Sequence, residues 1–572
     1  MLALALYLSC LPVVAQTQVT VEIKGISTEL ETNVRLLLSI EQQKNHPLIT
    51  TGRLQRLHQK ALQEISSALQ PFGYYRPKIE SSLIKSNSGI WQASYIIAAG
   101  PPLPISEFNF LISSEMSEDP EFVKLLKNNR LQTGSSFNHL KYEEFKADLA
   151  KLSIELGYFN AKFTEHRVEI DLDSYTARVY LNYAGGSRYY FGEVSMQQDV
   201  LNDELLQRFI PFNRGDYYSL DKLIDFQQAL NDTDYFQTAD VSARKTKPTN
   251  NEVPITVSLK PRKKHRYETG LGFGTDTGAR ARFRWLMPRV NKSGHRFNAD
   301  LEVSELGHSA IASYRVPVFN PRTDQVIYSI SETREKFEDT DSTLISLGVS
   351  LKHSRGKWRE TLAINYQQED FVSGDDQGNS TLLIPGISWS RTWGSNFINV
   401  FDGIRFDLSL SGANESLQSD TDFEQFQVGL KFINSLNSRN RVITRGVFGT
   451  TITPSFEQLP SSVRFFSGGA QSVRGFRFQS LGPTDNNGEV VGASNLVLGS
   501  IEFEHYLNDR WGAAVFIDVG NAIDDLNDDL EKGAGFGLRW KSPIGPVRID
   551  LASAVSRDGN PWRIHINIGP DL

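Results

Sequence analysis

The chain has 572 residues, a formal net charge of −7, 39% hydrophobic residues and a mean hydropathy of −0.34. The length predicts more than one folding unit, and no apolar run after the N-terminus reaches the roughly 18 residues of a membrane helix, which excludes a helical membrane protein. A membrane β-barrel remains open, because a transmembrane strand needs only about 10 residues with every second one apolar.

Residues 2–15 form a short apolar run that ends in Val13-Val14-Ala15. The small residues before the proposed cut resemble a secretory cleavage site, so we expect a signal peptide over residues 1–15. Cys10 is the only cysteine of the sequence, and its lipidation is the alternative. Cleavage after Ala15 leaves a mature chain that can form no disulfide, thiolate metal site or cysteine nucleophile.

A short motif recurs at intervals of about 80 residues in the N-terminal part. Its copies are Gly73-Tyr74-Tyr75, Gly157-Tyr158-Phe159 and Asp234-Tyr235-Phe236. Each copy follows apolar residues spaced three and four apart, which predicts a helix with one buried face. The glycines suit the left-handed position that ends a helix, and we expect Asp234 to replace glycine there.

An alternating stretch after each motif predicts a β-hairpin. The second and third units also begin with a short predicted strand, so each unit is expected to be a β-α-α-β-β module of the α+β class. We place the modules at residues 16–102, 103–187 and 188–264. The predicted hairpins cover residues 78–98, 162–183 and 239–259, and the opening strands cover 108–112 and 192–196.

This module and its closing motif resemble the POTRA domain, the periplasmic building block of outer-membrane assembly proteins. The resemblance implies that the modules bind extended polypeptide, with a strand added at the edge of a sheet. The alternative is that they only act as spacers.

The densest basic cluster, residues 262–266, follows the third module. We interpret it as a solvated interdomain linker, and a phosphate-facing role at a membrane surface is the alternative. Elsewhere the two signs of charge are scattered, so nucleic acid is not an expected partner.

Strict alternation of apolar and polar residues replaces helical periodicity in residues 265–572. In the stretches 297–304, 345–352, 404–411 and 562–569, every second residue is apolar. A soluble β-sandwich could alternate too, but the persistence over many segments with polar turns favours apolar residues toward lipid and polar residues toward a lumen. At about 19 residues per strand and loop, the region predicts an antiparallel barrel of about 16 strands.

Aromatic residues near segment ends could form interfacial girdles, with scattered hydrophobic filling as the alternative. They are Trp285, Tyr314, Trp358, Trp389, Trp393, Trp540 and Trp562.

Arg464-Phe465-Phe466-Ser467-Gly468-Gly469 is followed by Val473-Arg474-Gly475-Phe476. Taken alone, these residues would indicate a surface loop. They also resemble the loop of the POTRA-barrel superfamily that folds back into the lumen, where its arginine pairs with carboxylates of the inner wall. We therefore predict a lumenal latch of Val473, Arg474, Gly475 and Phe476.

The stretches 500–504 and 516–520 resemble the family strands that carry the acidic partners of this arginine. Alternation places Glu502, Glu504 and Asp518 opposite to their apolar neighbours and therefore toward the lumen. We predict that Glu502 and Asp518 pair with Arg474, because an unpaired buried charge is costly. Solvation of these groups by lumenal water is the alternative.

A third motif, Gly535–Trp540 with Ser542–Arg548 and Asp550, is similar to the penultimate hairpin of the superfamily. Within the superfamily, three modules disfavour the five-module BamA family and the two-module transporters of two-partner secretion. The stretches 492–495 and 569–572 resemble the TamA family, the outer-membrane subunit of the translocation and assembly module. One departure is that residues 562–568 lack the aromatic residue near the end that many barrel-targeting signals carry.

The sequence holds no G-x-S-x-G, HExxH or P-loop motif, so we expect no enzyme, metal or cofactor. Gly270, Gly272 and Gly274 lie in a predicted first barrel strand, where glycine weakens pairing. Pro570 cannot donate a hydrogen bond after the last strand. We therefore predict a labile seam between these glycines and the terminal strand residues Ile564, Ile566 and Ile568.

The resemblance implies a protein of the outer membrane, with its POTRA modules in the periplasm, that inserts or translocates outer-membrane proteins such as autotransporters. It also implies three partners: unfolded outer-membrane clients, membrane lipids and TamB, an inner-membrane-anchored subunit that spans the periplasm. The alternative is a passive channel or phospholipid conduit that docks to such a partner.

Overall fold

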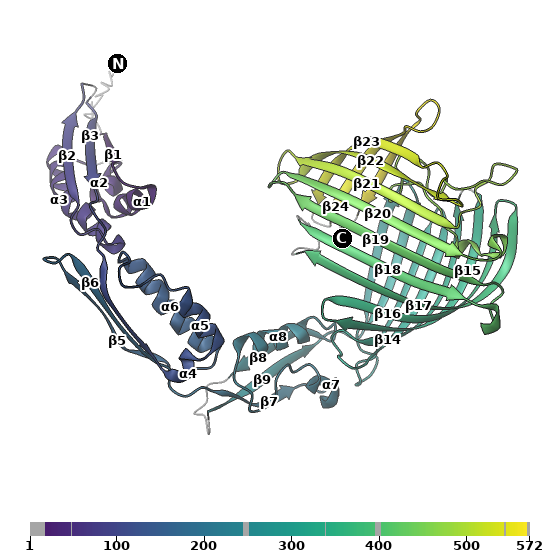
Figure 1. Ribbon diagram of the computed structural model, residues 1–572, viewed down its shortest axis with the longest axis horizontal. Coiled ribbons are helices and arrows are strands. Elements are labelled where there is room, and N and C mark those ends of the chain that lie inside the picture. The colour runs from purple at the N-terminus through teal and green to yellow at the C-terminus, as the bar shows by residue number, and fades with distance from the viewer. Residues whose placement is uncertain are drawn as a thin grey trace, which may run out of the picture. The chain divides into compact units, whose positions relative to one another are not determined.

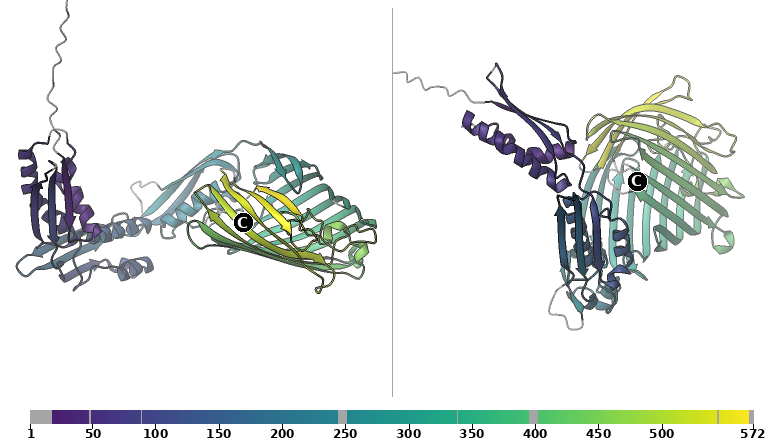
Figure 2. Two further views of the ribbon diagram at one scale, coloured as in Figure 1. Left: turned by 90° about the horizontal axis from the view of Figure 1, so that it is seen from above. Right: turned by 60° about the vertical axis from the view of Figure 1, so that its left-hand side comes forward.

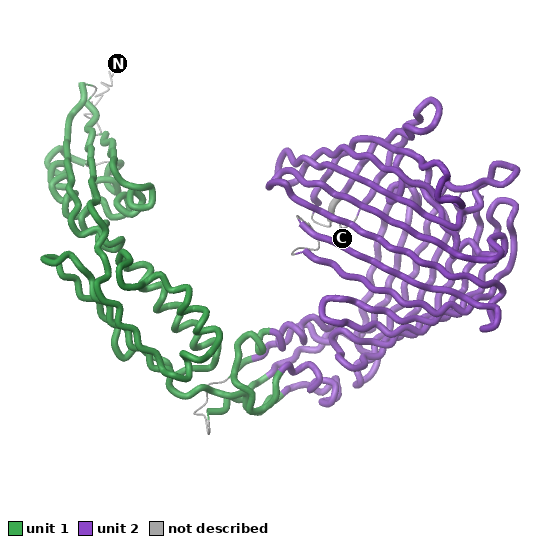
Figure 3. The backbone as a smooth tube through the Cα atoms, in the orientation of Figure 1, with its two compact units in different colours: residues 1–195, 212–224, 242–256 green, residues 196–211, 225–241, 257–572 purple. Residues whose placement is uncertain are grey.

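The computed structural model describes residues 18–46, 49–87, 89–243, 251–337, 339–394, 402–542 and 545–568. The predicted signal peptide with Cys10, and the terminal Gly569 and Pro570, lie outside these residues. Contacts divide the chain into two compact units, and the boundary between them passes through the third module (Figure 3).

The first two modules each contain a three-stranded sheet covered by helices, as predicted. In both sheets the last strand lies in the middle, parallel to the opening strand and antiparallel to the hairpin partner. Module 1 comprises β1 (Val19–Lys24), α1 (Thr28–Leu37), α2 (Ser39–Gln43), α3 (Thr51–Leu69), η1 (Gln70–Phe72), β2 (Lys78–Lys85) and β3 (Trp91–Ala98); module 2 comprises β4 (Ile105–Ile112), α4 (Ser114–Ser117), α5 (Pro120–Lys127), α6 (His139–Glu155), β5 (Lys162–Asp171) and β6 (Thr176–Ala184).

Module 3 repeats the same order of strands and helices. Its sheet has the order β7-β9-β8. None of the described helices is long and apolar enough to cross a membrane. The elements of module 3 are β7 (Tyr190–Gln197), α7 (Asp203–Gln207), α8 (Leu220–Asn231), β8 (Phe236–Ala243) and β9 (Glu252–Pro261).

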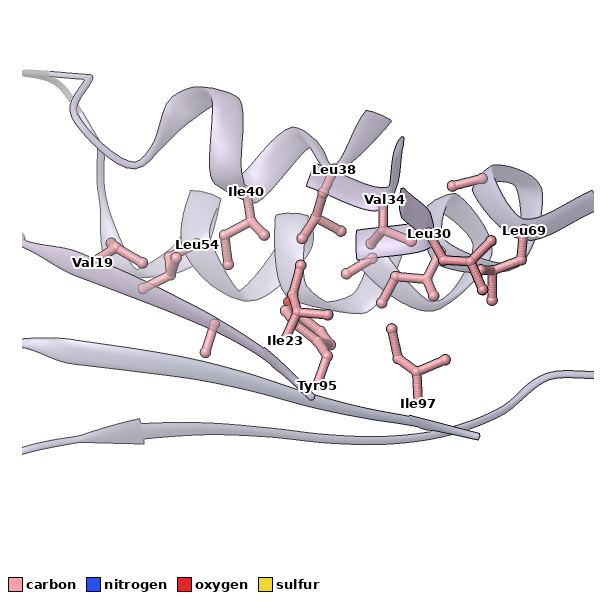
Figure 4. Close-up of a cluster of buried hydrophobic side chains, with 14 of the residues drawn as sticks. Val19, Ile23, Leu30, Val34, Leu38, Ile40, Leu54, Leu69, Tyr95 and Ile97 are labelled. Carbon is pink, nitrogen blue, oxygen red and sulfur yellow. The ribbon is translucent and has the colours of Figure 1, made fainter. Parts of the chain in front are cut away.

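The core of module 1 lies between its helices and its sheet (Figure 4). Val34 and Leu54 of the helices are fully buried against Tyr95 and Ile97 of β3. These are apolar positions spaced for one helix face and one strand face, so burial of one side of each element produces the two layers. The same two layers can be followed in the right-hand view of Figure 2.

Two of the three repeated motifs end as predicted. Gly73 has φ +90° and Gly157 has φ +86°, the left-handed conformation that glycine adopts without strain. The prediction for Asp234 is wrong, because it has no positive φ. Here the side chains of Asn231 and Thr233 bond to the main chain of Ala239 and Leu230, and the chain enters β8 without a left-handed residue.

His58 of α3 gives module 1 a pH dependence. Its Nδ1 lies 2.9 Å from the Tyr95 hydroxyl, and burial lowers the pKa of His58 below its ordinary value of 6.5. The unfolded chain therefore takes up the proton first, so this contribution to stability is complete above pH 6.5 and is lost as the pH falls toward the lowered value. We expect lower protection factors in α3, that is, amide exchange that is faster relative to the intrinsic rate at the same pH, at about pH 5.5 than at about pH 7.5, and His58→Gln should reduce the difference.

The C-terminal region forms one antiparallel sheet of 16 strands in sequence order, which confirms the predicted barrel (Figure 1). The connection between Pro261 and Arg266 holds the basic cluster and leads into the first barrel strand. The strands are β10 (Arg266–Gly274), β11 (Gly278–Met287), β12 (Arg296–Ser304), β13 (Gly307–Pro317), β14 (Gln325–Phe337), β15 (Thr340–Arg355), β16 (Trp358–Ser373), β17 (Asp376–Gly394), β18 (Gly403–Ala413), β19 (Phe423–Ser435), β20 (Asn440–Ile452), β21 (Asn495–Tyr506), β22 (Trp511–Ile523), β23 (Glu531–Ser542), β24 (Gly545–Ala554) and β25 (Trp562–Ile568).

Side-chain exposure distinguishes the barrel from a soluble sandwich. The apolar residues of the alternating stretches are partly or largely exposed, with Val303 at 60% and Leu347 at 50%. The polar residues between them face inward, where Asp300 accepts hydrogen bonds from Arg282. An apolar outer surface with a polar interior is the arrangement of a barrel that faces lipid.

The aromatic residues predicted for girdles gather mainly at one end of the barrel. All except Trp562 lie near the strand ends on the side where β10 begins. Trp358 and Trp393 pack edge to face at 6.0 Å, and the Arg391 guanidinium lies 4.3 Å from the centre of the Trp393 ring. An amphipathic belt of this kind suits a lipid–water interface.

Candidate functional site

The long connection between β20 and β21, residues 453–494, lies against the inner wall of the barrel. It contains the short helices η3 (Phe456–Gln458) and η4 (Ser461–Val463). Arg464, from the first predicted motif, is buried and donates to Asp376 Oδ2 at 2.7 Å. The same guanidinium donates to the carbonyl oxygens of Glu457, Leu459 and Val491, so this arginine anchors the loop to itself and to β17.

Arg474 is the second anchor of this loop. Its Nε donates to Asp518 Oδ2 at 2.7 Å and its Nη2 to Asp518 Oδ1 at 2.9 Å, a two-pronged pair to which the Arg474 main-chain N–H adds a third bond. Nη1 donates to Glu502 Oε2 at 2.6 Å and to Asp550 Oδ2 at 3.1 Å. The structure thus brings together the latch arginine and both carboxylates named from the sequence, and adds Asp550.

Burial makes this arrangement electrostatically demanding. Arg474 is only 3% exposed, and its guanidinium lies 3.3 Å from the centre of the Phe516 ring. A charge taken out of water at such a site needs excellent geometry and several hydrogen bonds. Bidentate pairing with Asp518 supplies both, and the aromatic face covers the remaining side of the cation.

A second buried arginine, Arg539 of β23, extends the network. It donates to Glu502 Oε1 at 2.7 Å through Nη2, to Asp550 Oδ1 at 2.5 Å through Nη1 and to Glu504 Oε1 at 3.0 Å through Nε. Glu504 also pairs with Arg441 of β20. Glu502 and Asp550 therefore each bridge the loop arginine and a wall arginine, so the loop is held by a network that spans five strands, β20 to β24.

The residues on either side of Arg474 in the latch have structural roles of their own. Val473 and Phe476 are buried in an apolar cluster with Leu481 and Ala554. Gly475 has φ +100°, and a Cβ there would lie 2.8 Å from the Ser553 carbonyl carbon. The position requires glycine for both conformation and space.

Gly533 of β23 is needed for the same close approach from the wall side. A Cβ at Gly533 would lie 1.9 Å from the Arg474 carbonyl oxygen, so Gly533→Ala must displace the loop. We expect a loss of about 1–3 kcal/mol and faster proteolysis of residues 453–494 in the folded barrel. Gly429→Ala is the matched control, because a Cβ at this lumenal glycine has its nearest neighbour at 4.0 Å. Equal protease resistance of the two variants would contradict close docking of the loop.

The predicted seam residues lie on the two terminal strands of the sheet. Gly270, Gly272 and Gly274 belong to β10, and Ile564, Ile566 and Ile568 belong to β25. The sheet order runs from β10 to β25, and within the described residues no backbone ladder joins these two strands. The turn that follows β10 reaches β25, because the Ile566 N–H donates to the Thr275 hydroxyl at 3.1 Å.

The ion pairs of this site hold the lumenal loop on the barrel wall. The carboxylates around Arg474 all accept hydrogen bonds from arginine. Within the described parts of the chain, no group of three or more His, Cys, Asp or Glu side chains is placed to hold a metal ion.

Sequence reasoning left out five residues that hold the loop or its network. They are Arg441, which pairs with Glu504; Arg539; Asp550; Asp276, which accepts from the Ala470 N–H; and His565, which accepts from the Gly475 N–H. Asp550 and Arg539 stand in the third motif, and alternation along β23 and β24 could have assigned both to the lumen. His565 also lies on the polar face of its strand. Asp276, in the turn between β10 and β11, carries no signal in the sequence, because its neighbours come from the far end of the chain.

Comparison with known proteins agrees with this geometry. Residues 249–571 match the Omp85 superfamily domain. Residues 20–99 match the POTRA domain described as TamA domain 1, and residues 189–262 match the POTRA family described as surface antigen variable number repeat.

Individual relatives share modest identity with the chain. It is 22% identical over 567 residues to the outer membrane protein assembly factor BamA of Nitratidesulfovibrio vulgaris, covering 92% of this chain and 69% of that protein. It is 20% identical over 292 residues to BamA of Buchnera aphidicola, covering 48% of this chain and 47% of that protein. The crystal structure of Haemophilus ducreyi BamA lacking POTRA domains 1–3 superposes with a TM-score of 0.67 at 17% identity, over 81% of this chain and 99% of that one.

More than half of the chain matches one family, and the barrel and the modules are those that this family combines. The chain therefore belongs to the Omp85 superfamily, as a barrel of the outer membrane whose POTRA modules lie in the periplasm.

Proposed function

We propose that this chain is an outer-membrane assembly factor that helps insert or translocate other outer-membrane proteins, autotransporters among them. The observation that carries the proposal is the pair of barrel edges, β10 and β25, which meet without a described backbone ladder. An unpaired strand edge presents N–H and C=O groups that the bilayer core cannot satisfy. A client strand that pairs with such an edge satisfies these groups and its own.

Within the superfamily we propose a TamA-type role. The match of residues 20–99 to the TamA domain 1 family and the presence of three modules support this assignment. The two relatives described above carry the name BamA at 22% and 20% identity, so the choice between the two roles has to be tested by function.

The proposed partners follow from the same assignment. Within the described residues no strand pairs with the outer edge of β2, β5 or β8 in the three module sheets, and we propose that an unfolded client adds a strand there. For module 1 we propose a second partner, the inner-membrane-anchored, periplasm-spanning TamB. Deletion of residues 16–100 should abolish co-purification of TamB while the barrel still folds. Retained co-purification would place the partner on another module.

The central experiment is crosslinking to nascent outer-membrane proteins in cells. A photoreactive residue at Leu271 or at Ile566 should capture client β-strands, because both side chains lie along the seam edges. Capture at neither position, while the variants still support growth or secretion, would overturn lateral insertion.

A lock on the seam provides the functional counterpart. In a Cys10→Ser background, a crosslink between Phe273→Cys and Ile566→Cys should abolish client assembly, and its reduction should restore it. The matched control is Phe283→Cys with Leu301→Cys, which face each other across the existing β11–β12 ladder. The control crosslink should leave activity unchanged. Full activity of the locked seam would show that no gate is required.

A passive channel or phospholipid conduit docked to the periplasm-spanning partner is the second candidate. Arg315, Lys352 and Arg359 lie on the lumenal side near the end where β10 begins, and they form no ion pair within the described residues. Such cations suit phosphate headgroups. Large, steady conductance across a planar bilayer, or lipid transfer with a locked seam, would favour this candidate over client insertion.

A further inference from the structure

The turn between β10 and β11 reaches the terminal strand and the lumenal loop at the same time. The Thr275 hydroxyl accepts a hydrogen bond from the Ile566 N–H of β25 at 3.1 Å. The neighbouring Asp276 turns to the loop, where its Oδ2 accepts from the Ala470 N–H at 2.8 Å. Two consecutive residues of one turn therefore bind two distant segments. The loop residue Ala470 lies 194 positions from Asp276 in the sequence, and Ile566 of β25 lies 291 positions from Thr275.

His565 of β25 completes the connection from the other strand edge. It is 1% exposed, and its Nε2 accepts a hydrogen bond from the Gly475 N–H of the latch at 2.9 Å. An Nε2 that accepts must be unprotonated, so in the neutral ring the proton lies on Nδ1. This Nδ1 faces Asp276 Oδ1 at 3.6 Å, and Asp550, which is bound to Arg474 and Arg539, lies opposite His565 in the β24–β25 register.

We propose that Thr275, Asp276 and His565 form a fastener that joins the two seam edges to the Arg474 loop, so that undocking of the loop and opening of the seam are one event. This inference rests on the proposed seam of the assembly factor and adds the positioning residues that control it. The physical reason is that the strand edges share no described ladder, so the few side-chain bonds across the seam carry its closure. Two of these three residues also bond the loop directly.

The test measures both motions in the full-length protein in phospholipid vesicles, in a Cys10→Ser background. The loop reporter is Ser467→Cys, a nearly isosteric change at a site that is 1% exposed, so a maleimide reacts only after the loop undocks. The seam reporter is the rate of crosslinking between Phe273→Cys and Ile566→Cys with a short bifunctional maleimide. Neither reading depends on a client, so a failure of the fastener is distinguishable from a failure of the proposed function.

Thr275→Val is the decisive variant, because among the described residues the Thr275 side chain bonds β25 and makes no bond to the loop. We expect slower crosslinking across the seam and, if the two events are one, about five- to tenfold faster labelling of Cys at position 467. Thr277→Val in the same turn is the matched control and should change neither rate. A looser seam with unchanged loop labelling, or no change in either rate, would overturn the proposal.

Two substitutions of His565 separate its contacts. His565→Gln can keep an acceptor near the position of Nε2 for Gly475, and His565→Asn can keep a donor near the position of Nδ1 for Asp276. Each should restore part of the loop protection and seam crosslinking that His565→Leu loses. Equal behaviour of all three variants, with both rates as in the parent protein, would show that the side chain fastens nothing.

Discussion

Arg474→Ala should release the lumenal loop and destabilise the barrel by about 3–5 kcal/mol, the usual cost of breaking a buried ion pair from one side. The substitution removes the two-pronged partner of Asp518 and an arginine that donates to both Glu502 and Asp550. These carboxylates are buried, so water does not replace the lost hydrogen bonds. Urea unfolding of the protein in lipid vesicles should shift to lower concentration, and protease should cut within residues 453–494 before the barrel unfolds.

Arg474→Lys should recover little of this loss, since an ammonium group cannot form the forked pair with Asp518 and also reach Glu502 and Asp550. Arg510→Ala is the matched control, because Arg510 is an exposed arginine in the turn between β21 and β22. If Arg474→Ala unfolded at the same urea concentration as Arg510→Ala, the lumenal network would contribute nothing to the stability of the barrel.

The architecture could be predicted from the sequence because it depends on local periodicity. A strand repeats every two residues, so alternation along residues 500–504 and 516–520 assigned Glu502 and Asp518 to the lumen without knowledge of the fold. The partnership of Glu502 with Arg539 could not be found in this way. These residues lie on β21 and β23, and only the register of the strand between them brings their side chains together.

Closure of the barrel sets a further limit on prediction. Asp276 and His565 are near opposite ends of the barrel sequence and face each other only because the sheet curls round on itself. The error at Asp234 has a more local cause. The motif resembled the two glycine copies, but the side chains of Asn231 and Thr233 satisfy the end of the helix, and no left-handed residue is required.

Arg539→Met should destabilise the barrel at least as much as Arg474→Ala, because Arg539 belongs to the barrel wall and contacts three carboxylates. Its guanidinium donates to Glu502, Glu504 and Asp550, and the residue is 1% exposed. Methionine fills much of the volume but leaves these anions with too few cations, and an uncompensated buried charge costs several kcal/mol. We expect the fraction of barrel that reaches the compact, heat-modifiable form to fall, and the protein that does fold to unfold at lower urea concentration.

A second substitution tests whether charge or shape causes this loss. In the variant Arg539→Met with Asp550→Asn, one anion of the network is removed, so the double variant should be more stable than Arg539→Met alone. Asp550→Asn by itself should be destabilising, because Arg474 and Arg539 then share one carboxylate fewer. Such a reversal of sign is expected of two groups in one electrostatic network, whereas independent packing defects add. Simple additivity in the double variant would mean that Arg539 supports the wall by volume, and the loop would then be held by Arg474 and Asp518 alone.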